Sequence, residues 1–298
     1  MKLQLKCIAR ITAVTCSLFS TVCYSVTREV TAVSEVAACQ TSGASPIRVR
    51  DDVRDEDCRT TPSVFETTIY EMGLCASHPF GTDKKGITFD NSTCTITYSD
   101  SAPNTVDLVD SIGGTLGLTG ISTMPPPGTY GYPYLVMGPS FTVAGSFTNS
   151  TTGDTYRSAA GRQVGINTAS DVSNTDTLNN FRDSGTCYSG YTGAVVTGGT
   201  MDGFIASGTL VRSEETQLTD GNCANQARLV AVMNLTTPFT VTSKTYSVQF
   251  NFLLTDFGVQ FIDDDNDRVE DEDADSDSIP SSFASAPFSG YFTILNAD

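Results

Sequence analysis

The sequence contains no tryptophan and a single histidine, His78, among its 298 residues. A Ser-His-Asp triad would need that histidine, and no GxSxG nucleophile elbow accompanies it. The count alone excludes a transition-metal site built on several histidines. Because Pro79 follows His78 in an expected loop, we predict an exposed histidine without a catalytic role. We expect a protein that is not an enzyme.

Basic residues are also scarce. Lys and Arg number 17 against 34 acids, which gives a net charge of −17. Such a chain repels phosphate backbones and anionic membrane surfaces, so we expect no nucleic-acid partner.

Carbohydrate chemistry has few obvious candidates. Proteins that bind sugars commonly stack the sugar ring on the indole ring of tryptophan, which is absent here. Tyr130, Tyr132 and Tyr134 could substitute. On a strand their alternate spacing places all three on one face, which favours core packing. A cleft with two acids would suit glycoside hydrolysis. The sequence does not separate four acids from ordinary solvent-facing strand residues: Glu66, Glu71, Asp107 and Asp110.

The chain has no long apolar run. The segment ITAVTCSLFSTV is too short for a spanning helix, and it follows Lys2, Lys6 and Arg10. With the small residue Ser25 after it, this is the pattern of a signal peptide over residues 1–25. We therefore predict a secreted or cell-surface protein with no membrane span after cleavage. Lipidation at Cys23 is the weaker alternative, because the residues before it fit a lipoprotein signal poorly.

Six cysteines remain after that segment. An even number in an exported chain predicts three disulfides, although six cysteines allow 15 pairings. None of the spacings is CxxC, which gives zinc little support. Order along the sequence favours three successive pairs: Cys39 with Cys58, Cys75 with Cys94, and Cys187 with Cys223.

We find no amphipathic helix of three turns in the mature sequence, and large side chains instead recur at every second position. The clearest run is KTYSVQFNFLL, for which we expect one buried and one wet face. The pattern predicts an all-β chain: an antiparallel β-sandwich with Greek-key or jelly-roll connections, Ig-like, with long polar loops. An N-terminal arm over 26–62 would precede a sandwich over 63–262.

Whether residues 63–262 form one sandwich or two is left open, with a boundary between 150 and 190 in the second case. Residues 149–190 are rich in Ser, Thr, Asn, Asp and Gly. We expect long loops there, with one helical turn near Leu178.

The segment MPPPGTYGYPYLV, around residues 124–136, carries a local resemblance. Pro126, Pro127, Gly128 and Tyr130 resemble the LPPGxY turn and strand of prealbumin-like and Ig-like modules of bacterial surface proteins. The resemblance implies a surface-protein sandwich in which the tyrosine enters the core, and it implies no activity.

A very acidic run, FIDDDNDRVEDEDADSDSIP, begins at Phe261. Nine of the 17 net negative charges lie between residues 263 and 277, and Arg268 is the only base among them. Such density opposes compaction unless a cation relieves the repulsion. Ca²⁺, which takes six to eight oxygen ligands, would do so.

The spacing of the acids resembles the DxDxDGxxD repeats of thrombospondin type 3 segments and, more distantly, an EF-hand loop. Two departures are Arg268 in place of the turn glycine and Ala274 in place of the EF-hand glutamate. An unliganded acidic linker is the alternative. The resemblance implies calcium ligands at Asp263, Asp265, Asp267 and Asp271 with the Val269 carbonyl, while Asp273 and Asp275 complete the shell or begin a second.

The chain ends in an apolar strand, residues 287–298, after an acidic loop and flexible linker over 263–286. Its candidate assembly residues are Phe288, Tyr291, Phe292 and Ile294. Such a strand either returns to its own sheet or inserts into a neighbouring subunit.

These observations favour a non-enzymatic structural or adhesive β-sandwich protein at the cell surface or outside the cell. Its sharpest form is a calcium-stabilised, pilus-like filament subunit that self-associates by strand addition or binds a cell-surface partner. The alternative is a carbohydrate-binding or carbohydrate-degrading module with a glycan partner, which would require a concave face with exposed tyrosines and acids.

Overall fold

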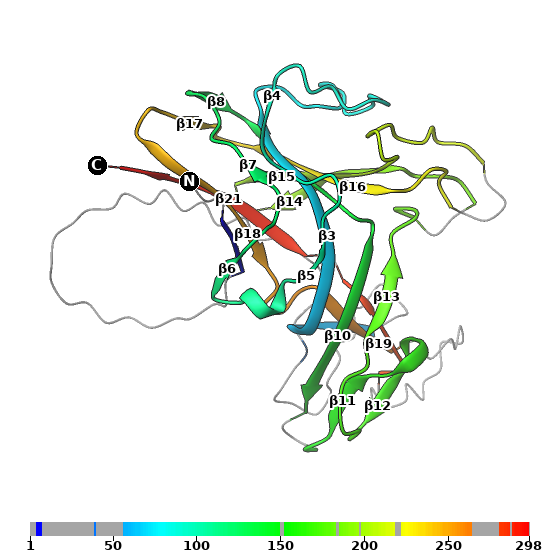
Figure 1. Cartoon of the computed structure of the whole chain (residues 1–298). Helices are drawn as coiled ribbons and strands as arrows, with labels where there is room; N and C mark the ends of the chain where they lie inside the picture. Colours follow the sequence, from blue (N-terminus) through cyan, green and yellow to red (C-terminus); the bar gives the residue numbers. More distant parts are fainter. Residues whose placement is uncertain are drawn as a thin grey trace, which may run out of the picture.

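The computed structural model describes residues 4–7, 39, 56–149, 152–182, 185–196, 198–217, 222–263, 280–286 and 288–297 (Figure 1). These residues form strands and two short 3₁₀ helices, η1 (Val109–Ser111) and η2 (Ala160–Arg162). The predicted all-β class is therefore confirmed. All strand pairs are antiparallel except that of β1 with β18.

The largest sheet has twelve strands and curls around the long strand β3 (Figure 1). Its main path runs β12-β11-β10-β3-β9-β16-β15-β14, with β13 on β10, β4 and β5 on β3, and β7 on β4. The strands are β3 (Pro62–Cys75), β4 (Cys94–Ser99), β5 (Thr105–Asp107), β7 (Ile121–Ser122), β9 (Tyr132–Met137), β10 (Ser140–Thr148), β11 (Thr155–Ser158), β12 (Val164–Ile166), β13 (Asn174–Thr177), β14 (Gly190–Val196), β15 (Gly199–Ala206) and β16 (Arg228–Leu235).

Three smaller sheets complete the architecture. The four-stranded sheet has the order β21-β18-β1-β6, the three-stranded sheet β2-β19-β20, and the two-stranded sheet β17-β8. Their strands are β1 (Gln4–Cys7), β2 (Glu56–Thr60), β6 (Gly114–Leu116), β8 (Gly128–Tyr130), β17 (Phe239–Val241), β18 (Thr245–Leu253), β19 (Val259–Asp263), β20 (Ser282–Ser285) and β21 (Ser289–Asn296).

A main core joins the large sheet to the four-stranded sheet. The ring centroid of Phe288 lies 5.7 Å from Phe65 and 5.8 Å from Phe141 of the large sheet. It also lies 5.5 Å from Phe252 of β18. Because these rings close the space between two layers, burial of their apolar area holds the sheets together.

A second, smaller core contains Tyr134 and Val136 of β9, Val230 and Val232 of β16, and Phe80 from the segment after β3. The large sheet therefore carries one apolar cluster besides the main core.

The three-stranded sheet contributes side chains to the main core. Phe261 of β19 lies 5.0 Å from Phe147 and 5.1 Å from Phe283. Phe283 is fully buried in β20, although its segment was expected to be a flexible linker. A strand forms there because Phe283 fills the core opposite Phe261.

The three predicted disulfides are confirmed, with Cα–Cα distances of 4.7 Å for Cys39–Cys58, 3.9 Å for Cys75–Cys94 and 4.8 Å for Cys187–Cys223. Disulfides of this number are typical of extracellular proteins.

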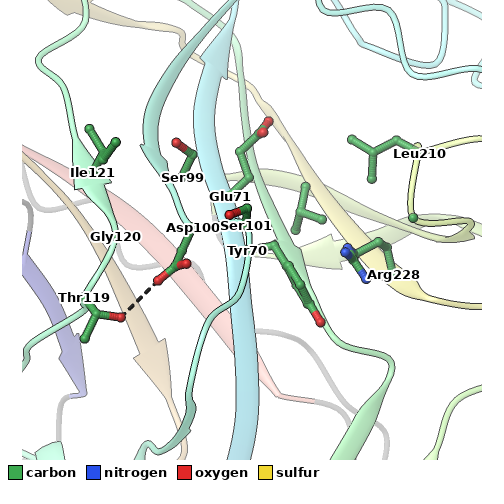
Figure 2. A pocket seen from close by; sticks show the side chains of 12 residues that line it. Tyr70, Glu71, Ser99, Asp100, Ser101, Thr119, Gly120, Ile121, Leu210 and Arg228 are labelled. Atoms are coloured by element: carbon green, nitrogen blue, oxygen red, sulfur yellow. Dashed lines mark hydrogen bonds between the residues drawn. The ribbon is translucent and has the colours of Figure 1, made fainter.

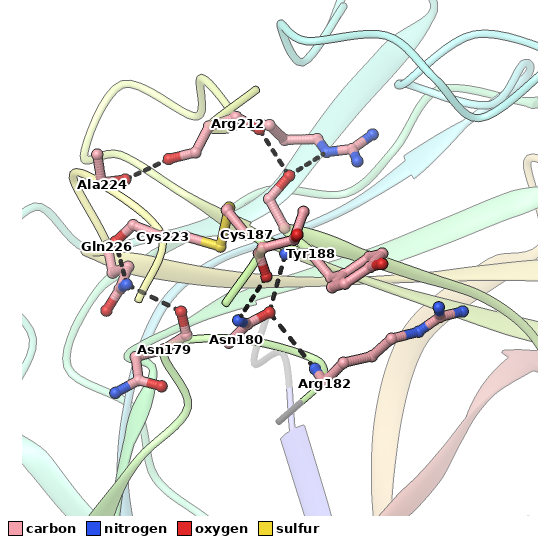
Figure 3. Close-up of a disulfide and its surroundings, with 12 residues drawn as sticks. Asn179, Asn180, Arg182, Cys187, Tyr188, Arg212, Cys223, Ala224 and Gln226 are labelled. Carbon is pink, nitrogen blue, oxygen red and sulfur yellow. Dashed lines mark hydrogen bonds between the residues drawn. A yellow bond between two sulfur atoms is a disulfide. The ribbon is translucent and has the colours of Figure 1, made fainter. Parts of the chain in front are cut away.

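Figure 3 shows how the third disulfide is supported by Asn180. Its side-chain oxygen accepts the N–H of Tyr188 at 2.8 Å and its amide donates to the Thr186 carbonyl at 2.9 Å. Together with the Cys187–Cys223 bond, these contacts fix two irregular segments far apart in sequence.

The region 149–190 differs from the expected loops. It contains β11, β12 and β13, and Leu178 lies in irregular backbone rather than in a helical turn. Hydroxyl pairs across neighbouring strands explain the strands: Thr148 meets Thr155 at 2.9 Å. Thr142 meets Thr175 at 3.0 Å. Polar side chains that bond across strands stabilise a sheet without an apolar pattern.

Strand β18 does not have the predicted wet face. Ser247, Gln249 and Asn251 are buried, as are the alternating residues Val248, Phe250 and Phe252, whereas Tyr246 at the start of the strand is exposed. Asn251 donates to the Tyr291 carbonyl at 3.2 Å and to the Thr293 hydroxyl at 3.0 Å, which offsets the cost of burying its amide.

The tyrosine segment is buried as predicted, but on two different clusters. Tyr130 enters the main core and its hydroxyl donates to the Pro126 carbonyl at 2.9 Å. Tyr134 belongs to the second core, against which Tyr132 also packs. The expected common face is wrong because Gly131 interrupts the strand between β8 and β9.

Candidate functional site

The predicted assembly strand lies in its own sheet. Strand β21 pairs with β18 along its length, with Phe292 opposite Phe250 at a ring distance of 4.9 Å. Tyr291 and Phe292 are buried, whereas Phe288 and Ile294 are partly buried against the main core. Within one chain, β21 therefore pairs with and covers one edge of β18.

The opposite edge of β18 is covered by residues from the predicted signal peptide. Strand β1 runs parallel to β18, with Leu5 opposite Phe250 and Cys7 opposite Phe252. It also pairs with β6, where Leu5 lies opposite Leu116. Among the described residues, this edge of β18 is paired by residues 4–7 alone.

The acidic run connects two neighbouring strands. Ile262 of β19 lies opposite Ser282 of β20 in the antiparallel register, so both ends of the connection are fixed side by side. Five predicted calcium ligands and the Val269 carbonyl lie outside the described residues: Asp265, Asp267, Val269, Asp271, Asp273 and Asp275. Asp263 ends β19. Within the described ranges no group of three or more His, Cys, Asp or Glu side chains could hold a metal ion, and calcium stays a prediction.

The four candidate acids are spread over different surroundings. Asp107 accepts the backbone N–H groups of Phe65 and Val109 at 3.0 and 2.9 Å, which assigns it a structural role at the start of η1. Glu66 lies opposite Asp107 in the β3–β5 register, and Asp110 is exposed. Glu71, on β3, has a different environment from these three acids because Tyr134 contacts it.

Glu71 is held by Tyr134, whose hydroxyl donates to Oε1 at 2.6 Å. Burial raises the pKa of Glu71, and the hydrogen bond from Tyr134 lowers it by less. Burial and the neighbouring carboxylate raise the pKa of Tyr134 in turn. Tyr134 is therefore a protonated donor at neutral pH, and Glu71 holds a proton more readily than an ordinary glutamate.

His78 is not the exposed loop histidine that the sequence predicts. Its side chain is buried, and Nε2 lies 3.2 Å from Oδ2 of Asp202. Its Nδ1 accepts the N–H of Phe80 at 3.1 Å, which leaves the proton on Nε2. The ring lies 5.9 Å from that of Phe204, so the segment after β3 buries it against the second core.

Asp202 is the centre of this buried cluster. Nζ of Lys84 lies 3.0 Å from its Oδ1 and 2.9 Å from its Oδ2, and the N–H of Gly193 donates at 2.7 Å. Burial alone would raise the pKa of Asp202, but hydrogen bonds from His78, Lys84 and Gly193 and the charge of Lys84 outweigh it and lower the pKa. The cluster ties three segments together.

This cluster does not resemble nucleophilic catalysis. Both ring nitrogens of His78 have fixed partners, so neither is free to accept a proton from a serine hydroxyl. The arrangement instead satisfies a buried carboxylate, as a structural ion cluster does.

Sequence reasoning missed three residues of interest, namely Asp202, Tyr70 and Arg228. Asp202 lies in the strand sequence GTMDGFIA. An acid inside such an apolar, glycine-containing strand could have indicated a buried carboxylate with a charged or hydrogen-bonding partner. The Cζ atom of Arg228 lies 3.5 Å from the centre of the Tyr70 ring, although the two residues are 158 positions apart in the sequence. No sequence spacing signals such a contact.

In the part of the chain that the structure covers, no helix has both the length and the apolar character needed to cross a membrane. Comparison with protein-family models, with curated proteins and with solved structures gave no match to this chain.

Proposed function

We propose that this protein is a non-enzymatic structural or adhesive subunit, secreted or displayed at the cell surface, that self-associates by strand addition to β18. One observation carries the proposal. Residues 247–252 of β18 are buried on both faces, and among the described residues one edge of the strand is covered by the predicted signal peptide alone.

Removal of residues 1–25 would take β1 away and leave that edge of β18 without its partner. Val248, Phe250 and Phe252 on β18 belong to the main core, so the freed edge borders apolar surface. An unpaired edge beside apolar side chains is a template for a strand from another chain. A strand of a second copy of this protein would restore the lost hydrogen bonds.

Calcium has a defined place in this proposal. The acidic connection begins and ends at adjacent strands, so its charges are held in a closed loop rather than a free tail. Closing eight net negative charges, those after Asp263, into such a loop costs Coulomb repulsion, and a bound Ca²⁺ would offset it. Calcium would thereby stabilise β19 and β20 next to the main core.

The experiment uses the chain that begins at Val26, with calcium and without it. Light scattering and electron microscopy should show assemblies larger than a monomer. A synthetic peptide of residues 2–10 with Cys7→Ser should inhibit assembly, because it refills the β1 position. The same peptide with Leu5→Pro should not inhibit, because proline removes a backbone donor and disfavours pairing.

A chain that stays monomeric at saturating calcium and high concentration contradicts the proposal. Donation of β21 itself to a neighbour stays a separate prediction, which requires that strand to leave β18. If deletion of residues 287–298 merely unfolds the monomer and no assembly forms, this filament form also fails.

A further inference from the structure

A pocket of about 580 Å³ opens beside β3, at the level of Glu71 (Figure 2). It lies on the large sheet and involves neither β18 nor β21, so it is independent of the proposed assembly. Its volume is in the range of small-ligand sites. Its lining includes Tyr70, Glu71, Ser99, Asp100, Ile121 and Arg228.

A β-bulge turns two consecutive residues of β3 toward this pocket. Ile69 lies opposite Met137 and Glu71 opposite Val136, so Tyr70 is the additional residue in the pairing with β9. In a regular strand, neighbouring side chains point to opposite faces. The bulge breaks that alternation, and Tyr70 and Glu71 both line the pocket.

The acceptors of the pocket are held in place. Oδ2 of Asp100 accepts the hydroxyl of Thr119 at 2.9 Å, and Oδ1 accepts the N–H of Ala102 at 3.0 Å. Gly120 allows the Thr119 segment to approach, because a Cβ there would lie 2.4 Å from the Ser99 carbonyl. The carboxylate is thus oriented before any ligand arrives, which lowers the entropy cost of binding.

The guanidinium group of Arg228 is a cation held in place against the ring of Tyr70. The Cζ atom of Arg228 lies 3.5 Å from the centre of the Tyr70 ring, and one guanidinium nitrogen donates to the Ala227 carbonyl at 2.7 Å. The stacked guanidinium keeps further N–H groups for a ligand oxygen.

The two carboxylates point in different directions. In Figure 2 the side chain of Glu71 runs away from Asp100, whose carboxylate turns toward Thr119. The pocket therefore offers acceptors that face different sides of a ligand.

The ligand class follows from the mixture of groups. Carboxylates accept hydrogen bonds, serine hydroxyls both accept and donate them, and Arg228 donates them. Ile121, which is 74% exposed, adds an apolar surface at the rim. A sugar ring has the matching surface, with hydroxyls that both donate and accept and C–H groups that pack on apolar side chains. The net charge of −17 repels anionic glycans.

We propose that this pocket binds a neutral saccharide unit, with Asp100 and Glu71 as acceptors, Arg228 as donor and Ile121 as the apolar contact. The test presents the disulfide-bonded chain, from Val26, to arrays of neutral and acidic glycans at physiological salt. Binding to a neutral glycan is then measured by calorimetry. Asp100→Asn and Arg228→Gln should each weaken that binding by about tenfold, the loss expected for one or two charged hydrogen bonds.

Asp110→Asn is the matched control, because the same change is made at an exposed acid outside the pocket. Ile121→Ser tests the apolar rim at a side chain whose exposure leaves folding intact, and it should also weaken binding. Absence of binding to any neutral glycan overturns the proposal, as does binding restricted to acidic glycans. Affinity that is unchanged in all three pocket variants, or equally reduced in Asp110→Asn, overturns it as well.

Discussion

The hydroxyl of Tyr134 donates to Oε1 of Glu71 at 2.6 Å, across two strands and 63 positions of sequence. The contact exists because Gly73 stands opposite Tyr134 in the register and has no side chain to block the ring. Tyr134 and Gly73 thus hold in place Glu71, which lines the pocket.

The first prediction concerns the pH dependence of this contact. The pKa of Glu71 is raised on folding, so between the ordinary value of 4.5 and the folded value the native state binds more protons than the unfolded state. The Glu71 contribution to stability is therefore full below the ordinary value and is lost as pH rises through the folded pKa. In Glu71→Gln this loss disappears.

Urea unfolding of Glu71→Gln and wild type between pH 4 and 8 should show a stability difference that shifts in favour of the variant as pH rises. Glu66→Gln, the same change on the same strand away from Tyr134, is the control. Parallel profiles for Glu71→Gln and wild type would contradict a raised pKa.

The second prediction tests the space at Gly73. A Cβ there would lie 2.4 Å from Cε1 of Tyr134, so Gly73→Ala must displace the buried ring. We expect a loss of about 1–3 kcal/mol in the free energy of unfolding. Gly117→Ala is the control, since a Cβ at Gly117 meets no atom within 4 Å. Equal stability of the two variants in chemical denaturation would argue against this packing.

The third prediction concerns Asp202. Asp202→Ala leaves His78, Lys84 and the Gly193 N–H without their acceptor, and we expect a loss of about 3 kcal/mol or more. Because the pKa of Asp202 is lowered on folding, its contribution is present above the ordinary carboxyl value and is lost as pH falls through the folded pKa. Thermal unfolding between pH 2 and 7 should show that acid sensitivity in wild type and its absence in the variant. Asp110→Ala should retain the wild-type profile.

The fourth prediction addresses the hold of β21 on β18. A Cβ at Gly290 would lie 2.4 Å from Cζ of Phe250 and 2.8 Å from the Asn251 carbonyl. Gly290→Val should therefore loosen the C-terminal strand at a cost of about 1–3 kcal/mol. Hydrogen exchange should rise in β21 and along β18, while β15 and β16 keep their protection. Unchanged exchange in β21 would contradict the packing of Gly290 against Phe250.

The fifth prediction tests calcium at the acidic connection. If the ion binds, calcium at 100 times its dissociation constant raises the free energy of unfolding by about 2.7 kcal/mol. Chelation should speed proteolysis between residues 263 and 277. The matched variant replaces Asp265 and Asp267 with Asn, which should remove both effects. Proteolysis that does not respond to calcium would identify the run as an unliganded spacer.

Strong alternation and cysteine order predicted much of the fold. The strands around Phe141 and Phe250 and all three disulfides are in place as expected. The strands β11 to β13 were missed because Thr–Thr pairs, rather than apolar alternation, stabilise them. The burial of His78 was missed because its partner Asp202 lies 124 positions away.

The candidate pocket was only partly visible in the sequence. Glu71 could be named as an acid on a strand, but its raised pKa depends on burial in the folded chain, where it pairs with Val136 of β9. Tyr70 reaches the same pocket only because the register shifts by one residue beside it. A shift of register is set by how strands pair, and no single strand encodes it.

Composition and local pattern by themselves determined the all-β class, the acidic charge and the even cysteine count that predicts three disulfides, because these follow from residue type and spacing. Cysteine order favoured one of 15 pairings, and the folded chain decided it. Tertiary structure alone decided that residues 247–252 of β18 are buried on both faces, that β20 stands next to β19, and that Tyr134 meets Glu71. Those features depend on surfaces that distant segments create together, and burial, register and desolvation arise only when the segments pack.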